Sequence, residues 1–173
     1  ASNGAVGLYH IDGLTPEAAK QGEKLLRKDA KEYIIDDAEL ERVYKSYPVM
    51  WKDASAKPTL CFIGCPHLTY SQLQGWTDAI ADALTAAGKA KVAVPTVLTA
   101  SPAVCQKFKK TEGYAKLADT GARLSSICPL MYTNNPLTKR RRIITNSNKL
   151  RTYSRSRYYL DEKILALITG KEV

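Results

Sequence analysis

One short stretch of the sequence places a thiol and an imidazole at a single turn. Residues 59–71 read TLCFIGCPHLTYS. The apolar run Leu60–Ile63 predicts a short buried strand that ends at Gly64, and the turn that follows carries Cys65 and His67. Open parallel α/β sheets bind ligands at the carboxyl ends of their strands. The N-terminus of a following helix would favour a thiolate or an anionic ligand. We therefore expect the chemistry of this chain to centre on the thiol of this turn.

Two more polar groups follow predicted strands. Cys128 follows the predicted strand 122–127, and the polar turn Asn146–Lys149 follows the predicted strand 142–145. If all these strands are parallel, both groups lie at the same edge of the sheet as Cys65. Two thiolates there suit a soft metal or an iron–sulfur cluster. Two ligands are too few for either, and a pair of buried free cysteines is the alternative.

The remaining candidate groups are a lysine, two further cysteines and the two histidines of the chain. Lys149, with the hydroxyl and amides of its turn, has the chemistry that a carboxylate or phosphate pocket needs; a capped, solvated loop is the alternative. Cys61 lies four residues before the turn cysteine, about 13 Å along a strand, too far to share one metal ion. We assign Cys61 to the core, and we expect Cys105 to lie in the core or at the surface rather than to act as a ligand. His10 and His67 both lie beside turns marked by glycine or proline, with ordinary surface histidines as the alternative.

A basic run with interleaved tyrosines marks the C-terminal part of the chain. Lys139–Arg142 is followed by further cations and aromatics, which are Arg151, Tyr153, Arg155, Arg157, Tyr158 and Tyr159. Such a stripe can track a nucleic-acid backbone, but no recognised nucleic-acid module accompanies it. A solvated face, or a surface for an acidic protein, fits as well. A non-enzymatic basic binding module is therefore the alternative to an enzyme.

The composition is that of one globular domain, or of one domain with a small appendage. The chain has 173 residues, of which 45% are hydrophobic, and a formal net charge of +9. No run approaches the ~18 apolar residues of a membrane span, and the first residues lack the features of a secretory signal. Four cysteines are too few for a disulfide scaffold. We expect reduced thiols, a cytoplasmic protein and no membrane partner.

Strands and helices alternate along the chain. Expected strands cover 5–11, 60–63, 91–98, 122–127 and 142–145, and expected helices cover 16–30, 38–47, 72–87, 102–111, 113–119 and 160–169. Alternation of this kind implies right-handed crossovers. The predicted fold class is α/β, with a mostly parallel sheet and helices on both faces.

Four segments resemble the catalytic large subunit of the aconitase X family, a branch of the aconitase superfamily. They fall in the family's order and at about its spacing, and they are Asn3–Ala18, Ile63–Leu68, Ser126–Pro129 and Ile144–Lys149. The resemblance covers the C-terminal half of that subunit, so we expect a fragment, a cleaved chain or one piece of a split enzyme. It implies an aconitase-superfamily-like domain, in which residues 1–58 are an N-terminal helical segment and residues 59–173 are the cluster- and substrate-binding core.

The resemblance also implies an iron–sulfur-dependent hydro-lyase component. Cys65 and Cys128 match two of the three cysteines that hold the family's cluster, which would be of the [4Fe-4S] or [2Fe-2S] type. The third ligand would lie outside this chain. An iron left open by three thiolates could act as a Lewis acid on a leaving hydroxyl. Lys149 matches a substrate-binding lysine. His67 and Ser147 are the implied catalytic residues.

The implied substrate is a small hydroxy acid, such as cis-3-hydroxy-L-proline or phosphomevalonate. The implied partners are the N-terminal half of the large subunit and a small swivelling subunit, and nucleic acid is not expected. His10, like Ser147, is a weaker candidate for the active site, and a general base is implied to come from outside this chain. Two segments depart from the family pattern and bear on the substrate: the basic run before the last predicted strand, and LRTYSRSRYYL after Lys149, where a His-Tyr pair and a proline are more usual.

Overall fold

The structure is a computed structural model that describes residues 6–133, 135–136, 138 and 140–171. Contacts between Cα atoms divide the chain into two compact units, Ala1–Tyr47 and Pro48–Val173. The expected assignment of residues 1–58 to the same domain as the core stays a prediction. Across the described residues, no helix is both long and apolar enough to cross a membrane.

The first unit contains short helical elements and little buried surface. Its elements are α1 (Pro16–Gln21), the 3₁₀ helix η1 (Gly22–Leu25) and α2 (Asp37–Lys45). The helix expected at 16–30 is shorter because Gly22 adopts a φ of 54° and ends α1. The strand expected at 5–11 is not formed by residues 6–11. Within residues 6–47, Ala18 is the one buried residue, so this unit has almost no core of its own.

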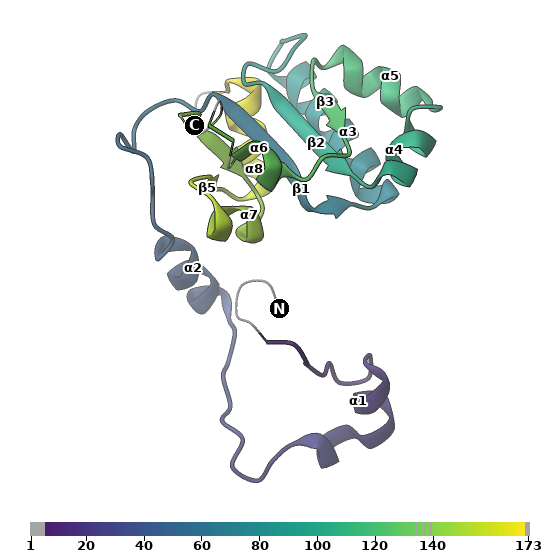
Figure 1. Cartoon of the computed structure of the whole chain (residues 1–173), viewed down its shortest axis with the longest axis vertical. Coiled ribbons are helices and arrows are strands. Elements are labelled where there is room, and N and C mark those ends of the chain that lie inside the picture. The colour runs from purple at the N-terminus through teal and green to yellow at the C-terminus, as the bar shows by residue number, and fades with distance from the viewer. Residues whose placement is uncertain (1–5, 134, 137, 139, 172–173) are drawn as a thin grey trace. The chain divides into compact units, whose positions relative to one another are not determined.

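The second unit is built on a parallel sheet of five strands (Figure 1). The strands are β1 (Leu60–Leu68), β2 (Thr96–Ala100), β3 (Arg123–Ser125), β4 (Ile143–Thr145) and β5 (Arg157–Tyr158). Their order across the sheet is β3-β2-β1-β4-β5, and every neighbouring pair is parallel. The predicted α/β class and parallel sheet are confirmed, with β5 as a strand that the sequence did not predict.

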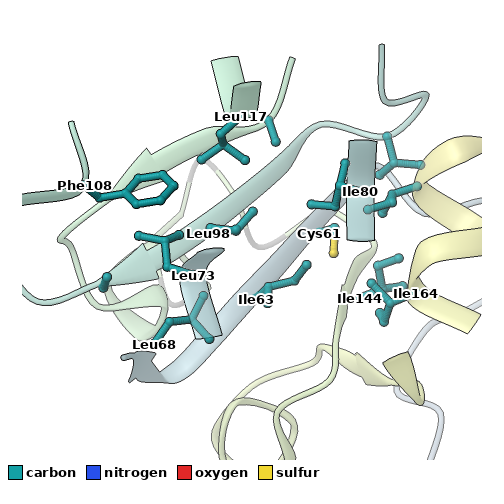
Figure 2. Close-up of a cluster of buried hydrophobic side chains, with 14 of the residues drawn as sticks. Cys61, Ile63, Leu68, Leu73, Ile80, Leu98, Phe108, Leu117, Ile144 and Ile164 are labelled. Carbon is teal, nitrogen blue, oxygen red and sulfur yellow. The ribbon is translucent and has the colours of Figure 1, made fainter. Parts of the chain in front are cut away.

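Helices cover both faces of this sheet, as predicted. They are α3 (Tyr70–Ala86), α4 (Pro102–Phe108), α5 (Glu112–Asp119), α6 (Pro129–Thr133), α7 (Asn148–Tyr153) and α8 (Asp161–Thr169). Alternate residues of β1 point to opposite faces. Cys61 and Ile63 enter the larger core cluster, which α3, α4, α5 and α8 complete (Figure 2). Phe62 enters the smaller cluster, which α6 and α7 complete.

Several expected elements differ from the structure in extent or in type. β2 begins at Thr96 rather than at residue 91 because Pro95 has no N–H, and the preceding backbone bonds elsewhere: Val92 N donates to Thr120 O, at 2.9 Å, and Ala93 N to Ile168 O, at 2.7 Å. The turns expected after Cys128 and at residues 146–149 instead lead into the short helices α6 and α7.

Candidate functional site

β1 does not end before Cys65. Ile63 pairs with Leu98 and Leu68 pairs with Ala100, so residues 64–67 of β1 stand opposite the single residue Thr99 of β2. The extra residues bulge out of the ladder at the carboxyl edge of the sheet. The peptide bond between Cys65 and Pro66 is cis. The predicted strand end at residue 63 is therefore wrong, and the turn cysteine lies within a bulged strand.

Gly64 holds this bulge against β2. Its φ is 106°, and a Cβ atom at this position would lie 2.4 Å from the backbone oxygen of Thr99. The Thr99 hydroxyl also donates to the backbone oxygens of Gly64 and Ile63. No side chain fits in this space, so glycine is required here. Sequence reasoning missed Thr99, since a threonine inside a strand is typical of ordinary β structure.

Cys65 is 8% exposed and packs in the smaller core cluster. Burial raises the pKa of its thiol above the ordinary value, and the neighbouring thiol of Cys128 acts in the same direction. A hydrogen bond from Ser147 and the positive charge of Lys149 oppose this rise in pKa. α3 begins only at Tyr70, five residues after Cys65, and burial is the largest influence on the pKa of the Cys65 thiol.

Ser147 connects α7 to the bulge. Its hydroxyl donates to the backbone oxygen of Cys65 and accepts a hydrogen bond from the backbone N–H of Leu150, at 3.0 Å, as the N-cap of α7. Its own N–H donates to the hydroxyl of Thr145, at 3.1 Å. The side chain is buried. These bonds make Ser147 a positioning residue, and its predicted catalytic role stays a prediction.

Two further predicted site residues approach Cys65 from other elements. Cys128 is exposed and lies directly before α6. Tyr132 of α6 packs on Phe62 of β1, with ring centroids 5.5 Å apart. Lys149 is half-buried in the first turn of α7. Both residues change the pKa of the Cys65 thiol through their charge. The segments that follow β3 and β4 thus carry a thiol and an ammonium group at the same edge of the parallel sheet as the buried Cys65 thiol.

The other candidate residues are two exposed histidines and two buried cysteines. His67 is exposed on the bulge, and His10 is exposed in the first unit. Cys61 and Cys105 are buried members of the larger core cluster, and burial raises the pKa of both thiols. The Cys105 thiol donates to the backbone oxygen of Ala100, at 3.4 Å. The prediction that Cys61 belongs to the core is confirmed, and Cys105, expected in the core or at the surface, is also a core residue.

The sulfur donors at this edge fit a thiolate-held metal centre in type but not in number. All four cysteines are free. Among the residues that the structure describes, no group of three or more His, Cys, Asp or Glu side chains is arranged to hold a metal ion. Cys65 and Cys128 supply two soft ligands, which is the chemistry that iron–sulfur clusters use. A cluster held by this pair therefore needs at least one ligand from outside the described residues.

Comparison with known families gives this arrangement a context. Residues 58–165 match the family described as aconitase X third domain. The chain belongs to the aconitase X family. This aconitase X chain is 28% identical over 158 residues to the phosphomevalonate dehydratase large subunit of Thermococcus kodakarensis, covering 90% of this chain and 36% of that protein. It is 35% identical over 74 residues to the protein of the same name from Methanosarcina mazei, covering 43% and 16%.

A solved structure shares the fold. The crystal structure of Thermococcus kodakaraensis aconitase X in its holo-form superposes with a TM-score of 0.61 at 23% identity, covering 82% of this aconitase X chain and 36% of that one. The chain therefore spans about a third or less of the length of these relatives. The expected aconitase-superfamily-like fold is confirmed for the part that aligns.

Proposed function

We propose that this aconitase X chain is the cluster- and substrate-binding part of an iron–sulfur-dependent dehydratase. Cys65 and Cys128 would hold a cluster of the [4Fe-4S] or [2Fe-2S] type, with a third thiolate from the N-terminal half of the large subunit. Lys149 would bind the carboxylate or phosphate of a small hydroxy acid. When bound, the cluster would supply a Lewis acid for the leaving hydroxyl.

The observation that supports this proposal is that Cys65, Cys128 and Lys149 follow strands of one parallel sheet and so share its carboxyl edge. The charges of Cys128 and Lys149 also act on the pKa of the Cys65 thiol. An ammonium beside two thiolates offsets part of their negative charge and can orient an anionic substrate next to the metal. The Ser147 hydrogen bond fixes α7, and with it Lys149, against the bulge that carries Cys65.

The proposal also concerns the groups that would transfer protons and the location of the protein in the cell. His67 is the exposed imidazole nearest in sequence to Cys65 and could exchange protons with substrate or solvent. A base that removes the substrate proton would come from elsewhere, including the small swivelling subunit. Because four free thiols suit a reducing compartment, we also propose a cytoplasmic location.

The test is iron and sulfide analysis under anaerobic conditions. The chain is co-expressed with the rest of its large subunit and with the small subunit, and the complex is purified and its visible absorption spectrum recorded. We expect iron and sulfide in the complex and their loss in Cys128→Ser, which changes an exposed residue and leaves the core intact. Cys105→Ala, which removes a buried core thiol, is the matched control and should retain the iron.

Two outcomes would contradict the proposal. Folded protein without iron under every pairing would exclude a cluster in this chain, and zinc in place of iron would identify a different metal centre. The substrate is tested separately with the loaded complex, by comparing dehydration of cis-3-hydroxy-L-proline with that of phosphomevalonate. We expect Lys149→Gln to raise KM for the true substrate without changing the iron content.

A further inference from the structure

A concave basic site lies at the opposite edge of the sheet. Arg142 directly precedes β4 and Arg155 comes two residues before β5, so both lie at the amino ends of parallel strands, whereas Lys149 follows the carboxyl end of β4. The cavity has a volume of about 670 Å³. The charged side chains that line it are five cations and one acid, which are Lys52, Arg140, Arg141, Arg142, Arg155 and Asp53.

The wall formed by residues 50–57 is fixed to the sheet by hydrogen bonds. The Arg142 guanidinium donates from Nε to the backbone oxygen of Lys57, at 2.6 Å. The indole N–H of Trp51 donates to the backbone oxygen of Arg155, at 3.1 Å. Arg157 donates to the backbone oxygen of Ala54, at 2.6 Å, and its guanidinium lies 5.7 Å from the ring centroid of Trp51. The cavity is therefore preformed rather than a gap beneath a loose loop.

The charges in this cavity are not balanced. The Asp53 carboxylate accepts two hydrogen bonds from Ser55, at 2.9 and 2.6 Å. These bonds lower the pKa of Asp53, and the charge of Arg142 lowers it further. None of the ion pairs found among the described residues involves the five cations. Arg140 and Arg141 are exposed and have no carboxylate partner within that part of the chain, so their donors are available to an anion.

We propose that this cavity binds a small molecule with two or more phosphate groups, which Arg140 and Arg141 contact directly. Paired guanidinium groups match phosphate oxygens in bidentate geometry, and several cations around one concavity concentrate anions there. The volume lies within the range of small-ligand sites. This binding is separate from the proposed cluster, since the two sites occupy opposite edges of the sheet.

The arrangement favours a small ligand over a nucleic acid. A strand of nucleic acid requires a continuous basic track, but the cations of the basic sequence run are divided between different places. Arg151 lies in α7, which follows β4, and bonds to Asn148 and Thr152. Arg157 is engaged with Ala54 and with the ring of Tyr159. Among the described cations of the run, Arg140 and Arg141 are exposed and line the cavity together.

The test is a calorimetric titration of the purified chain with sodium pyrophosphate at fixed ionic strength. Orthophosphate and a single-stranded oligonucleotide of about twelve thymidines serve as comparison ligands. We expect saturable binding of pyrophosphate, weaker binding of orthophosphate, and a loss of at least about tenfold in pyrophosphate affinity in R140Q/R141Q. The double variant K109Q/K110Q removes the same charge from two exposed lysines elsewhere in the second unit and should bind like the unmodified chain.

Several results would overturn the proposal. Absence of saturable pyrophosphate binding, or equal losses in the two double variants, would reduce the cavity to a general basic surface. An oligonucleotide that binds more tightly than pyrophosphate and displaces it would assign the cavity to nucleic acid instead. Retention of pyrophosphate binding in Cys128→Ser would support the independence of this site from the cluster, and its loss there would contradict it.

Discussion

The hydroxyl of Ser147 donates a hydrogen bond to the backbone oxygen of Cys65, joining residues 82 positions apart in the sequence. The hydroxyl oxygen of Ser147 also caps α7 by accepting a hydrogen bond from the backbone N–H of Leu150. The Ser147 side chain thereby connects two elements. One is the strand bulge that carries Cys65, the proposed cluster ligand, and the other is α7, which carries Lys149, the proposed substrate-binding residue. A change at Ser147 should affect both at once.

We predict that Ser147→Ala lowers the free energy of unfolding by about 2 kcal/mol. The substitution removes the N-cap of α7 and leaves a buried backbone oxygen at Cys65 without this partner. Urea unfolding followed by circular dichroism measures the loss. Ser126→Ala, at an exposed position, is the matched control and should lie within about 0.5 kcal/mol of the unmodified chain. Equal stabilities for the two variants would show that the bond contributes nothing.

Gly64→Ala should destabilise the chain by about 3 kcal/mol. The new methyl group would meet the backbone oxygen of Thr99 at 2.4 Å, and the φ of 106° disfavours any residue with a Cβ. The control is Gly75→Ala inside α3, where the added Cβ would meet no atom within 4 Å apart from its chain neighbours and the backbone of its own helix, and this change should stabilise by about 0.5–1 kcal/mol. Chemical denaturation of both variants distinguishes them by sign. A tolerated alanine at position 64 would refute the close approach of β1 and β2.

Thr69→Ala should lower the free energy of unfolding by about 1 kcal/mol, because Thr69 caps α3 in a reciprocal capping box with Gln72. Thr85→Ala lies in the same helix, where its hydroxyl bonds back to Ala81 O at 3.0 Å. Alanine is the better helix former at such a position, so this variant should be neutral or slightly more stable. Thermal unfolding of the pair measures the difference, and a larger loss at residue 85 would contradict the assigned cap.

Much of the fold follows from local sequence patterns. The spacing of Leu73, Trp76, Ile80 and Leu84 predicts α3. Leu73, Ile80 and Leu84 are buried in its packed face, and Trp76 is partly buried against the same core. Strands alternating with helices predict the parallel sheet. β5 escapes prediction because it is two residues long and pairs only through β4. The short helices α6 and α7 have five and six residues, too few for a helical period to be visible against polar composition.

The site is partly predictable for a topological reason. Parallel strands end at one edge, so Cys128 and Lys149 could be expected near Cys65 without a local motif. The raised pKa of the Cys65 thiol could not be predicted from the sequence, because the burial of this thiol depends on Phe62 and Ile143 and on the helices that form around them. The basic cavity was also hidden, since it joins the loop around Trp51 to residues that lie far from it in sequence.

The protonation of Cys65 offers a test of the site in the absence of a cluster. Burial raises the pKa of this thiol, so its protonated form persists to higher pH than that of an ordinary cysteine, whose pKa is about 8.5. The contribution of this group to the free energy of unfolding is complete below about pH 8.5 and is lost as pH rises through the folded-state pKa. Alkylation follows the thiolate fraction, so it reports the same equilibrium independently of stability.

We predict that iodoacetamide modification of Cys65 has a pH midpoint above that of a free cysteine. The two charged neighbours should shift it in opposite directions: Lys149→Gln removes a positive charge and raises the midpoint, and Cys128→Ser removes a competing thiolate and lowers it. Mass spectrometry of the peptide after timed alkylation gives the profile. Lys110→Gln, an exposed lysine elsewhere, should leave the midpoint unchanged. Shifts of the same sign in the Lys149 and Cys128 variants would refute the convergence of the three residues, because only their opposite charges distinguish the two effects.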